Sequence, residues 1–309
     1  MTPDWSDLTA RLDWPDHPVD AVIDTDTFNE IDDQFAVSLL VRSTSRITTK
    51  ALFAAPFHNA KSTGAADGMR KSYEEIVRLL SLLGRDDLAS VVFEGATAYL
   101  PNEDEPVRSD AAVHLTELAM AYSPERPLYV IATAAITNVA SALLIAPDIA
   151  ARIVIVWLGG HAHHWPDTQE FNLFQDVAAA RVVMASGAAL VQLPCMGVVS
   201  ALTTSGPELE RWLRGRSGLA DYLVDITTRE ALAESRHATW TRPIWDVAPV
   251  AWLLDQRVTR SSLVPAPLPT YDGHYSFDSG RHPIRYVYWV DRDAVFEALF
   301  EALGRTELP

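Results

Sequence analysis

The sequence predicts an α/β fold with a doubly wound, mostly parallel sheet, helices on both faces and a more helical C-terminal part. Over roughly the first two thirds of the 309 residues, short β-rich runs alternate with longer helical patterns. The expected strands are continuously apolar, as in a parallel sheet covered on both faces. No linker, repeat or low-complexity tract interrupts the chain, so we expect a single domain spanning residues 1–309.

The strand–helix alternation begins at "DAVID" and ends at "AALVQLP". The expected strands occupy residues 20–24, 46–55, 89–95, 127–133, 152–160 and 188–194. Helices are expected between them at residues 32–43, 66–84, 110–122, 137–146 and 176–186. The second of these contains "EEIVRLLSLLG", whose apolar residues recur at the spacing of an amphipathic helix.

After residue 200 the pattern becomes more helical. Helices are expected at residues 206–215, 219–235 and 246–256. A late strand at 284–290, "IRYVYWV", precedes a final helix at 291–304. The stretch 264–283 is rich in Pro, Gly and Asp, which favours a loop.

The charge balance restricts the classes of partner. Lys and Arg total 25 and Asp and Glu total 41, giving a net charge of −16. Such a surface repels phosphate backbones and anionic lipid, so we expect neither nucleic acid nor a membrane as partner. A neutral or cationic small ligand, or a metal cation, fits better.

The single cysteine, Cys195, rules out an intramolecular disulfide and a cysteine-based zinc site. Its apolar neighbourhood, "LVQLPCMGV", favours a buried small hydrophobe over a nucleophile. The N-terminus has no apolar signal core, and no run reaches roughly 18 apolar residues. We therefore expect a soluble cytoplasmic protein.

The densest chemical signal is the stretch "DTDTFNEIDD", residues 24–33, which carries five acidic side chains. In open α/β sheets, ligands bind beyond the carboxyl ends of the strands, where Asp26, Asp32 and Asp33 can converge. A hard divalent cation with oxygen ligands would neutralise them. The alternative is that Asp32 and Asp33 only cap a helix while Asp24 and Asp26 are solvated.

Two metal-enzyme interpretations compete. "IDTDT" fits the Asp-x-Asp-x-Thr opening of the haloacid-dehalogenase-like phosphatases, but those enzymes place their second acidic pair late in the chain. In this sequence the Asp-Asp pair follows at once.

A broader set of motifs resembles the inosine-uridine-preferring nucleoside hydrolases. The matching segments are "DTDTFNEIDDQFA", "VIATAAITNVASAL", "IVIVWLGG" followed by "EFNLFQDVAAARVV", and "IWDVAPVAWLL". They occur in the family's order and span roughly residues 20 to 300. Each motif alone is weak, but the joint pattern is specific.

The resemblance implies a Ca²⁺ site and a division of labour among its residues. Asp26, Asp33 and Asp246 would bind Ca²⁺ through carboxylates, and Thr133 through its backbone carbonyl. Asp32 would be the general base that takes a proton from the attacking water. Such a site suits an oxocarbenium-like transition state, which needs an activated water and nearby negative charge.

The resemblance also implies the substrate contacts. Glu170 and Asn172 would hydrogen-bond the ribose hydroxyls, and His164 lies nearest the position of a sugar-binding Asn in the family. Trp245 replaces the family's usual His before the last calcium ligand, which leaves the leaving-group acid unassigned. We expect Trp245 to stack on the nucleobase, which favours purines because their aromatic face is larger.

The expected function is calcium-dependent hydrolysis of the N-glycosidic bond of ribonucleosides, with a lean to purine nucleosides. The alternatives are the metal-dependent phosphatase and a non-catalytic nucleoside-binding protein on the same scaffold, although a pure binder needs no general base such as Asp32 beside Asp33. The resemblance also suggests a homodimer or homotetramer. One departure concerns the loop "TFNE", which makes the spacing between Asp26 and the Asp-Asp pair two residues longer than in the commonest form. The sequence assigns no role to Asn29 and Glu30 in this loop, nor to His161 and His163.

Overall fold

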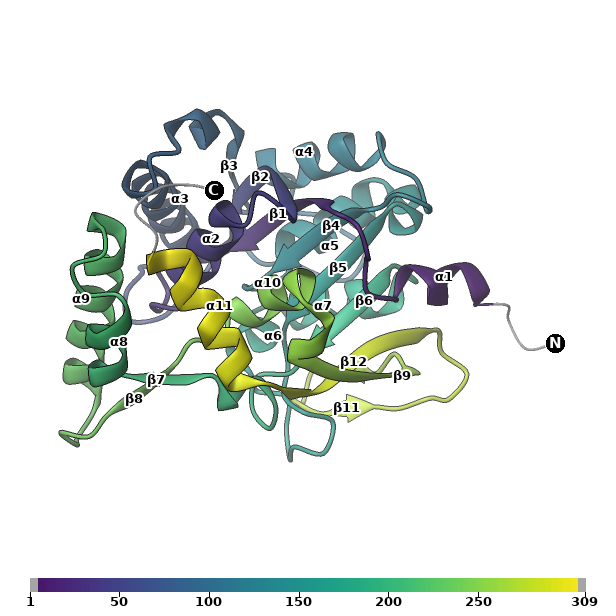
Figure 1. Cartoon of the computed structure of the whole chain (residues 1–309). Helices are drawn as coiled ribbons and strands as arrows, with labels where there is room; N and C mark the ends of the chain where they lie inside the picture. Colours follow the sequence, from purple (N-terminus) through teal and green to yellow (C-terminus); the bar gives the residue numbers. More distant parts are fainter. Residues whose placement is uncertain (1–4, 305–309) are drawn as a thin grey trace.

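The centre of the protein is an eight-stranded sheet (Figure 1). The computed structural model describes residues 5–304. The strand order is β3-β2-β1-β4-β5-β6-β12-β9. In that order the strands are Val92–Glu94, Ile47–Ala54, Val19–Thr25, Leu128–Ala132, Ile153–Leu158, Ala189–Leu193, Pro283–Val290 and Thr259–Pro265. All neighbouring pairs are parallel except β12 and β9, so the expected mostly parallel sheet is confirmed.

Helices cover both faces of the sheet. In chain order α1 to α11 are Ser6–Arg11, Asp33–Arg42, Ala65–Leu82, Asp110–Ala119, Thr137–Ile145, Phe171–Gln175, Val177–Ala185, Gly206–Trp212, Gly218–Glu234, Val247–Leu254 and Arg292–Gly304. Figure 1 shows α2, α10 and α11 on one side of the sheet and α4 and α5 on the other. The part after residue 200 contains the four helices α8 to α11, at the positions where helices were expected.

The two faces of the sheet bury separate apolar layers. On β1, Ala21 and Ile23 belong to the core beneath α2, α3, α10 and α11, whereas Val22 belongs to the core beneath α4, α5 and α7. Successive side chains of a strand point to opposite faces, so a strand covered on both sides must be apolar at every position. This explains the unbroken apolar runs in the sequence.

Several elements differ from the expectation. β9 pairs with β12 as an antiparallel edge strand and overlaps the start of the stretch expected to be a loop. Within that stretch, Leu268–Pro269 (β10) pairs with Tyr275–Ser276 (β11), and a second small ribbon joins Thr203–Ser205 (β7) to Thr241–Pro243 (β8). These strands are short or largely exposed, so they leave no apolar run in the sequence.

No helix within residues 5–304 is both long enough and apolar enough to cross a membrane.

Candidate active site

The candidate site lies where the strand order reverses. β1 pairs with β2 on one side and with β4 on the other, and both pairs are parallel. The crevice beyond the carboxyl ends of β1 and β4 is therefore the usual ligand position of a doubly wound sheet. Asp26 follows β1 there and Thr133 follows β4, which brings two predicted site residues to one edge.

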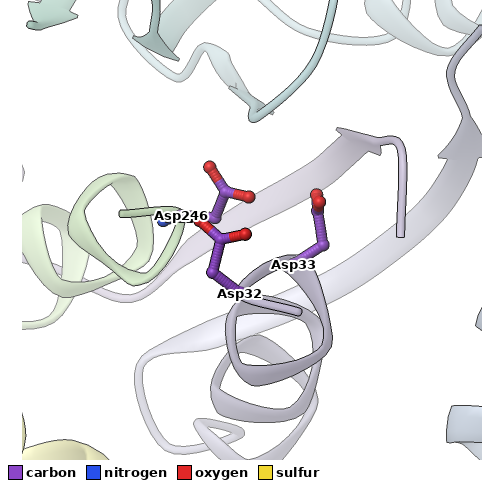
Figure 2. Close-up of side chains that lie close together, drawn as sticks. All are labelled: Asp32, Asp33 and Asp246. Atoms are coloured by element: carbon purple, nitrogen blue, oxygen red, sulfur yellow. Dashed lines mark hydrogen bonds between the residues drawn. The ribbon is translucent and has the colours of Figure 1, made fainter. Parts of the chain in front are cut away.

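Three carboxylates converge at this edge (Figure 2). Asp32, Asp33 and Asp246 are buried, and each offers an oxygen within 4.8 Å of an oxygen of the other two. Asp32 and Asp33 stand at the start of α2, and Asp246 stands at the start of α10. The cluster therefore joins two helix starts that are far apart in the sequence.

Helix capping does not account for these carboxylates. Asp32 and Asp246 occupy the N-cap positions of α2 and α10, yet neither side chain makes a capping hydrogen bond in the described structure. Oδ2 of Asp32 instead accepts the backbone N–H of Asp246 at 3.3 Å. The alternative that the Asp-Asp pair only caps a helix is therefore not supported for Asp32.

Hydroxyl groups orient Asp33, while Asp26 has no donor. Oδ1 of Asp33 accepts hydrogen bonds from the hydroxyls of Thr25 and Thr133, the second at 2.9 Å. Both carboxylate oxygens of Asp26 are buried, and no hydrogen-bond partner within residues 5–304 reaches them. A buried carboxylate without a donor is costly unless a cation compensates it.

The pKa values of these carboxyl groups also indicate that a cation would stabilise the cluster. Burial raises the pKa of Asp26, Asp32 and Asp246 well above the ordinary value, and repulsion from the neighbouring carboxylates raises it further. Burial also raises the pKa of Asp33, although the two threonine hydroxyls oppose that shift. Like charges this close are tolerated when a divalent cation lies between them, and carboxylate oxygens are the ligands that Ca²⁺ prefers.

Asp32 belongs to the cluster of three carboxylates with Asp33 and Asp246, and Asp26 does not belong to it. Asp26 nevertheless lies near enough for its charge to be among the causes that raise the pKa of Asp246. The carboxylates expected to act as ligands and base therefore share one buried region. Their individual roles stay predictions.

Glu170 and Asn172 line the same cavity as Asp26, Asp32 and Asp246 and lie at the start of α6. The Glu170 carboxylate accepts the backbone N–H groups of Gly160, Asn172 and Leu173 at 2.8–2.9 Å. Burial raises its pKa to about 7. The Asn172 amide donates to the backbone oxygen of Leu158 at 3.0 Å, so both side chains are held by the main chain.

A cavity connects these residues with groups that the sequence left unassigned. Its wall includes Asn29, Glu30, His161, Cys195 and Trp245 in addition to the carboxylates. The Trp245 indole N–H is buried, with no acceptor in the part of the chain that the structure describes. Burial raises the pKa of the Cys195 thiol, so this residue is not an activated nucleophile even though it borders the cavity.

The histidine loop is arranged differently from the expectation. His164 is exposed and is not among the residues lining the cavity, whereas His161 is buried and forms part of its wall. His163 points elsewhere, because its Nε2 pairs with Gln192 and its ring stacks on Tyr286 at 4.0 Å between centroids. Counting residues from Glu170 could not reveal which histidine faces the cavity.

A second buried contact was also missed from the sequence. Asp24 accepts a hydrogen bond from the Asn138 amide at 2.8 Å, and the Asn138 oxygen accepts the backbone N–H of Ala96. Burial raises the pKa of Asp24 to about 7. Asp24 is therefore a buried residue whose side chain links the end of β1 to α5. It is not the solvated loop residue that the helix-capping alternative assumed.

The family model described as "Inosine-uridine preferring nucleoside hydrolase" matches residues 21–297. The chain belongs to this family. The resemblance found in the sequence motifs is thus confirmed over nearly the whole chain. The expected enzyme class, N-glycosyl hydrolases acting on ribonucleosides, is the class that the family's name describes.

Curated relatives of this nucleoside hydrolase family member are distant. The pyrimidine-specific ribonucleoside hydrolase RihA of Citrobacter koseri is 26% identical over 210 residues, covering 60% of this chain and 66% of that protein. RihA of Shewanella woodyi is 28% identical over 211 residues, with the same coverage. The matched part therefore spans just under two thirds of the length of these two relatives.

Solved structures of nucleoside hydrolases share the fold over a longer range. A purine-preferring ribonucleoside hydrolase from Gardnerella vaginalis superposes with a TM-score of 0.76 at 18% identity, covering 92% of this chain and 98% of that one. The plant nucleoside hydrolase PpNRh1 gives 0.74 at 20% identity, covering 93% and 99%. The nucleoside hydrolase fold is thus confirmed independently of the sequence motifs.

Proposed function

We propose that this protein hydrolyses the N-glycosidic bond of ribonucleosides with the help of a bound Ca²⁺ ion. The observation that carries the proposal is the cluster of Asp32, Asp33 and Asp246, with the donor-free Asp26 beside it, at the switch point of the sheet. A helix cap or a solvated loop requires no such cluster. Family membership supports this function over the phosphatase alternative.

The cation would be held by Asp26, Asp33 and Asp246 and by the backbone oxygen of Thr133. The donor set fits Ca²⁺, because all these ligands are oxygens and three are carboxylates without a competing capping role. Once bound, a divalent cation supplies positive charge that favours ionisation of a nearby water. Zinc is a poorer fit, because the cluster found within residues 5–304 consists of three Asp side chains and includes no Cys or His.

Asp32 is the proposed general base. It takes a proton from the attacking water, whose oxygen bonds to C1′ of the ribose while the C1′–N bond breaks. The electron pair of that bond leaves with the nucleobase. The raised pKa of Asp32 in the cation-free protein comes from burial and from Asp33, and a cation in the cluster would offset both effects.

Glu170 and Asn172 are proposed to hold the ribose hydroxyls. Each oxygen of Glu170 already receives at least one backbone N–H, which fixes the carboxylate and leaves lone pairs for a sugar hydroxyl. Both side chains sit on a helix start tied to the ends of β5, so their position is rigid. Rigid placement favours orientation of C1′ against the water.

Base preference is proposed to lean to purines through stacking on Trp245, whose indole lines the cavity. The names of relatives differ on this point, since the curated ones are called pyrimidine-specific and the Gardnerella vaginalis structure purine-preferring. A role in nucleoside salvage, a cytoplasmic location and a homodimer or homotetramer belong to the same proposal and rest on the family resemblance.

The proposal is tested by measuring reducing-sugar release from a panel of purine and pyrimidine ribonucleosides, with Ca²⁺ present and after chelation. We expect release of ribose in the first condition and its loss in the second. A protein that binds nucleosides but releases no sugar would instead support the non-catalytic alternative. Hydrolysis of phosphate esters with Mg²⁺ would support the phosphatase.

A further inference from the structure

The cavity is rich in hydrogen-bond acceptors. Its carboxyl side chains are Asp26, Glu30, Asp32, Glu170 and Asp246. An ionised carboxylate accepts hydrogen bonds but donates none. Sugar hydroxyls can donate to such groups, whereas the ring nitrogens and carbonyl oxygens of a nucleobase need a donor. A departing base also gains negative charge, which makes a donor on its side of the cavity more important.

His161 is held rigidly in the wall of this cavity. The loop after β5 pairs with the loop after β6 through two backbone hydrogen bonds, Cys195 N–H to the Gly160 oxygen at 2.8 Å and Ala162 N–H to the Met196 oxygen at 2.9 Å. Gly160 also donates its N–H to Glu170. The imidazole therefore has a fixed place next to the proposed sugar contacts.

The tautomer of His161 follows from its partner. Nδ1 receives the backbone N–H of Met196 at 3.3 Å. A backbone N–H can only donate, so Nδ1 must accept and the ring hydrogen lies on Nε2. Burial lowers the pKa of His161, which agrees with a neutral ring, and the carboxylate of Asp167 only partly opposes that shift.

The Nε2–H group is left without an acceptor. The carboxylate oxygen of Asp167 lies 3.9 Å from Nε2, beyond hydrogen-bonding distance. No hydrogen bond from this nitrogen is found within residues 5–304, and Nε2 is not among the fully buried atoms, so it keeps some exposure although His161 as a whole is only 8% exposed. Such a donor can pair with an acceptor that a ligand brings into the cavity.

We propose that His161 donates a hydrogen bond from Nε2 to the departing nucleobase. This inference rests on the proposed function. As the C1′–N bond breaks, its electrons stay with the base, and the N–H group of the neutral imidazole stabilises the developing negative charge. His161 keeps its proton throughout. Asp32 holds the proton taken from water, and the released base anion is then protonated by solvent, so atoms and charges balance.

The test compares two substitutions of His161 on two kinds of leaving group. His161→Asn keeps an oxygen near Nδ1 for Met196 but has no donor near Nε2, whereas His161→Gln places an amide N–H near Nε2. The substrates are inosine, whose base is a poor leaving group, and p-nitrophenyl β-D-ribofuranoside, whose anion is stable without a donor. His17→Asn, at the exposed opposite end of the sheet, is the matched control.

We expect His161→Asn to lower kcat/KM for inosine by about 10²–10³-fold, as for loss of one preorganised donor to a developing anion. The p-nitrophenyl substrate should lose far less, and His161→Gln should recover part of the inosine activity. Equal losses on both substrates, or no loss on inosine, would overturn the inference. A wild-type protein inactive on both substrates would instead refute the proposed function.

If His161→Asn lowers the thermal midpoint enough to unfold the protein, His161→Gln carries the test alone. The inference then requires the inosine to p-nitrophenyl activity ratio to change in His161→Gln relative to wild type and to His17→Asn. An unchanged ratio would overturn it, because a purely structural role of His161 would lower both activities together.

Discussion

The backbone N–H of Asp246 donates to Oδ2 of Asp32 at 3.3 Å and joins two helix starts that are 214 residues apart. This bond ties α10 to α2 at the sheet edge formed by the carboxyl ends of β1 and β4. The carboxylate cluster is consequently complete only when the whole sheet and both helices are in place. A site of this kind depends on global folding, which is why its function and its stability are linked.

Asp32→Asn should abolish most of the turnover while preserving substrate binding. Asn keeps the shape and an oxygen for the Asp246 N–H, but it does not accept the proton of water at neutral pH. Loss of a general base typically costs ~10²–10⁴-fold in rate. The measurement is kcat for inosine together with the Kd of inosine by titration calorimetry.

The matched control for this substitution is Asp20→Asn, at the opposite end of β1, where the side chain is partly exposed. This variant should retain the wild-type kcat. An Asp32→Asn protein with unimpaired turnover would exclude Asp32 as the base and would leave the adjacent acidic pair without a catalytic explanation.

Ca²⁺ should stabilise the folded protein. An ion that binds only the folded state at 100 times its Kd adds about 2.7 kcal/mol, which corresponds to roughly 4 °C in the thermal midpoint of a chain of this size. Chelation should reverse the shift. Asp33→Asn removes one carboxylate from the cluster of Asp32, Asp33 and Asp246. In this variant the thermal midpoint should respond neither to added Ca²⁺ nor to the chelator. A wild-type midpoint unchanged by Ca²⁺ would speak against the metal site.

The cation-free protein should lose stability as pH rises. Burial raises the pKa of Asp24 and Glu170 to about 7, from ordinary values of 3.8 and 4.5. A raised carboxyl pKa favours folding fully below the unfolded value, and this contribution is lost as pH rises through the folded value. Stability measured by urea unfolding in chelator should therefore fall between about pH 4 and pH 7. A rise in stability over this range would contradict the raised pKa values of the buried Asp24 and Glu170 carboxyl groups.

Glu170→Gln isolates one part of that pH dependence. The amide oxygen can still accept a backbone N–H at the start of α6, but the side chain no longer titrates. We expect a shallower loss of stability with pH in chelator and a raised KM for inosine, because a sugar contact is weakened. Glu170 accepts three backbone hydrogen bonds, so a purely structural role as a helix cap is the alternative to a sugar contact. An unchanged KM would support that structural role.

Trp245→Ala should impair purine nucleosides more than pyrimidine nucleosides. Base–aromatic stacking is worth about 1–3 kcal/mol per base, or roughly 5- to 150-fold in kcat/KM. The exposed Trp212 on α8 provides a control substitution that removes a comparable side chain outside the cavity wall. Equal losses for inosine and uridine, or a wild type that prefers uridine, would defeat the proposed basis of selectivity.

Much of the fold was predictable because its strands are covered on both faces. Continuous apolar runs such as residues 127–133 and 152–160 occur only where both sides of a strand are buried, and each became a central strand. β9 was missed for the opposite reason. It is an edge strand with largely exposed side chains and a proline at its end, so it carries neither an apolar run nor a regular alternation.

The candidate site was predictable only where residues follow strand ends or open helices. Asp26, Asp33, Thr133 and Asp246 occupy such positions, so topology alone brings them to one region. The roles of loop residues depend on contacts between distant segments. His161 faces the cavity because residues 160–162 pair with residues 195–196, and no spacing in the sequence encodes that pairing.

The products that the purified protein forms from inosine, with Ca²⁺ and excess inorganic phosphate present, show directly whether it is a ribonucleoside hydrolase. We expect free hypoxanthine and free ribose in equal amounts, detected by chromatography and mass spectrometry, and neither product from Asp32→Asn at a comparable rate. Two results would contradict ribonucleoside hydrolysis. One is that inosine and the other purine and pyrimidine nucleosides all stay intact after prolonged incubation. The other is that ribose phosphate forms in place of ribose.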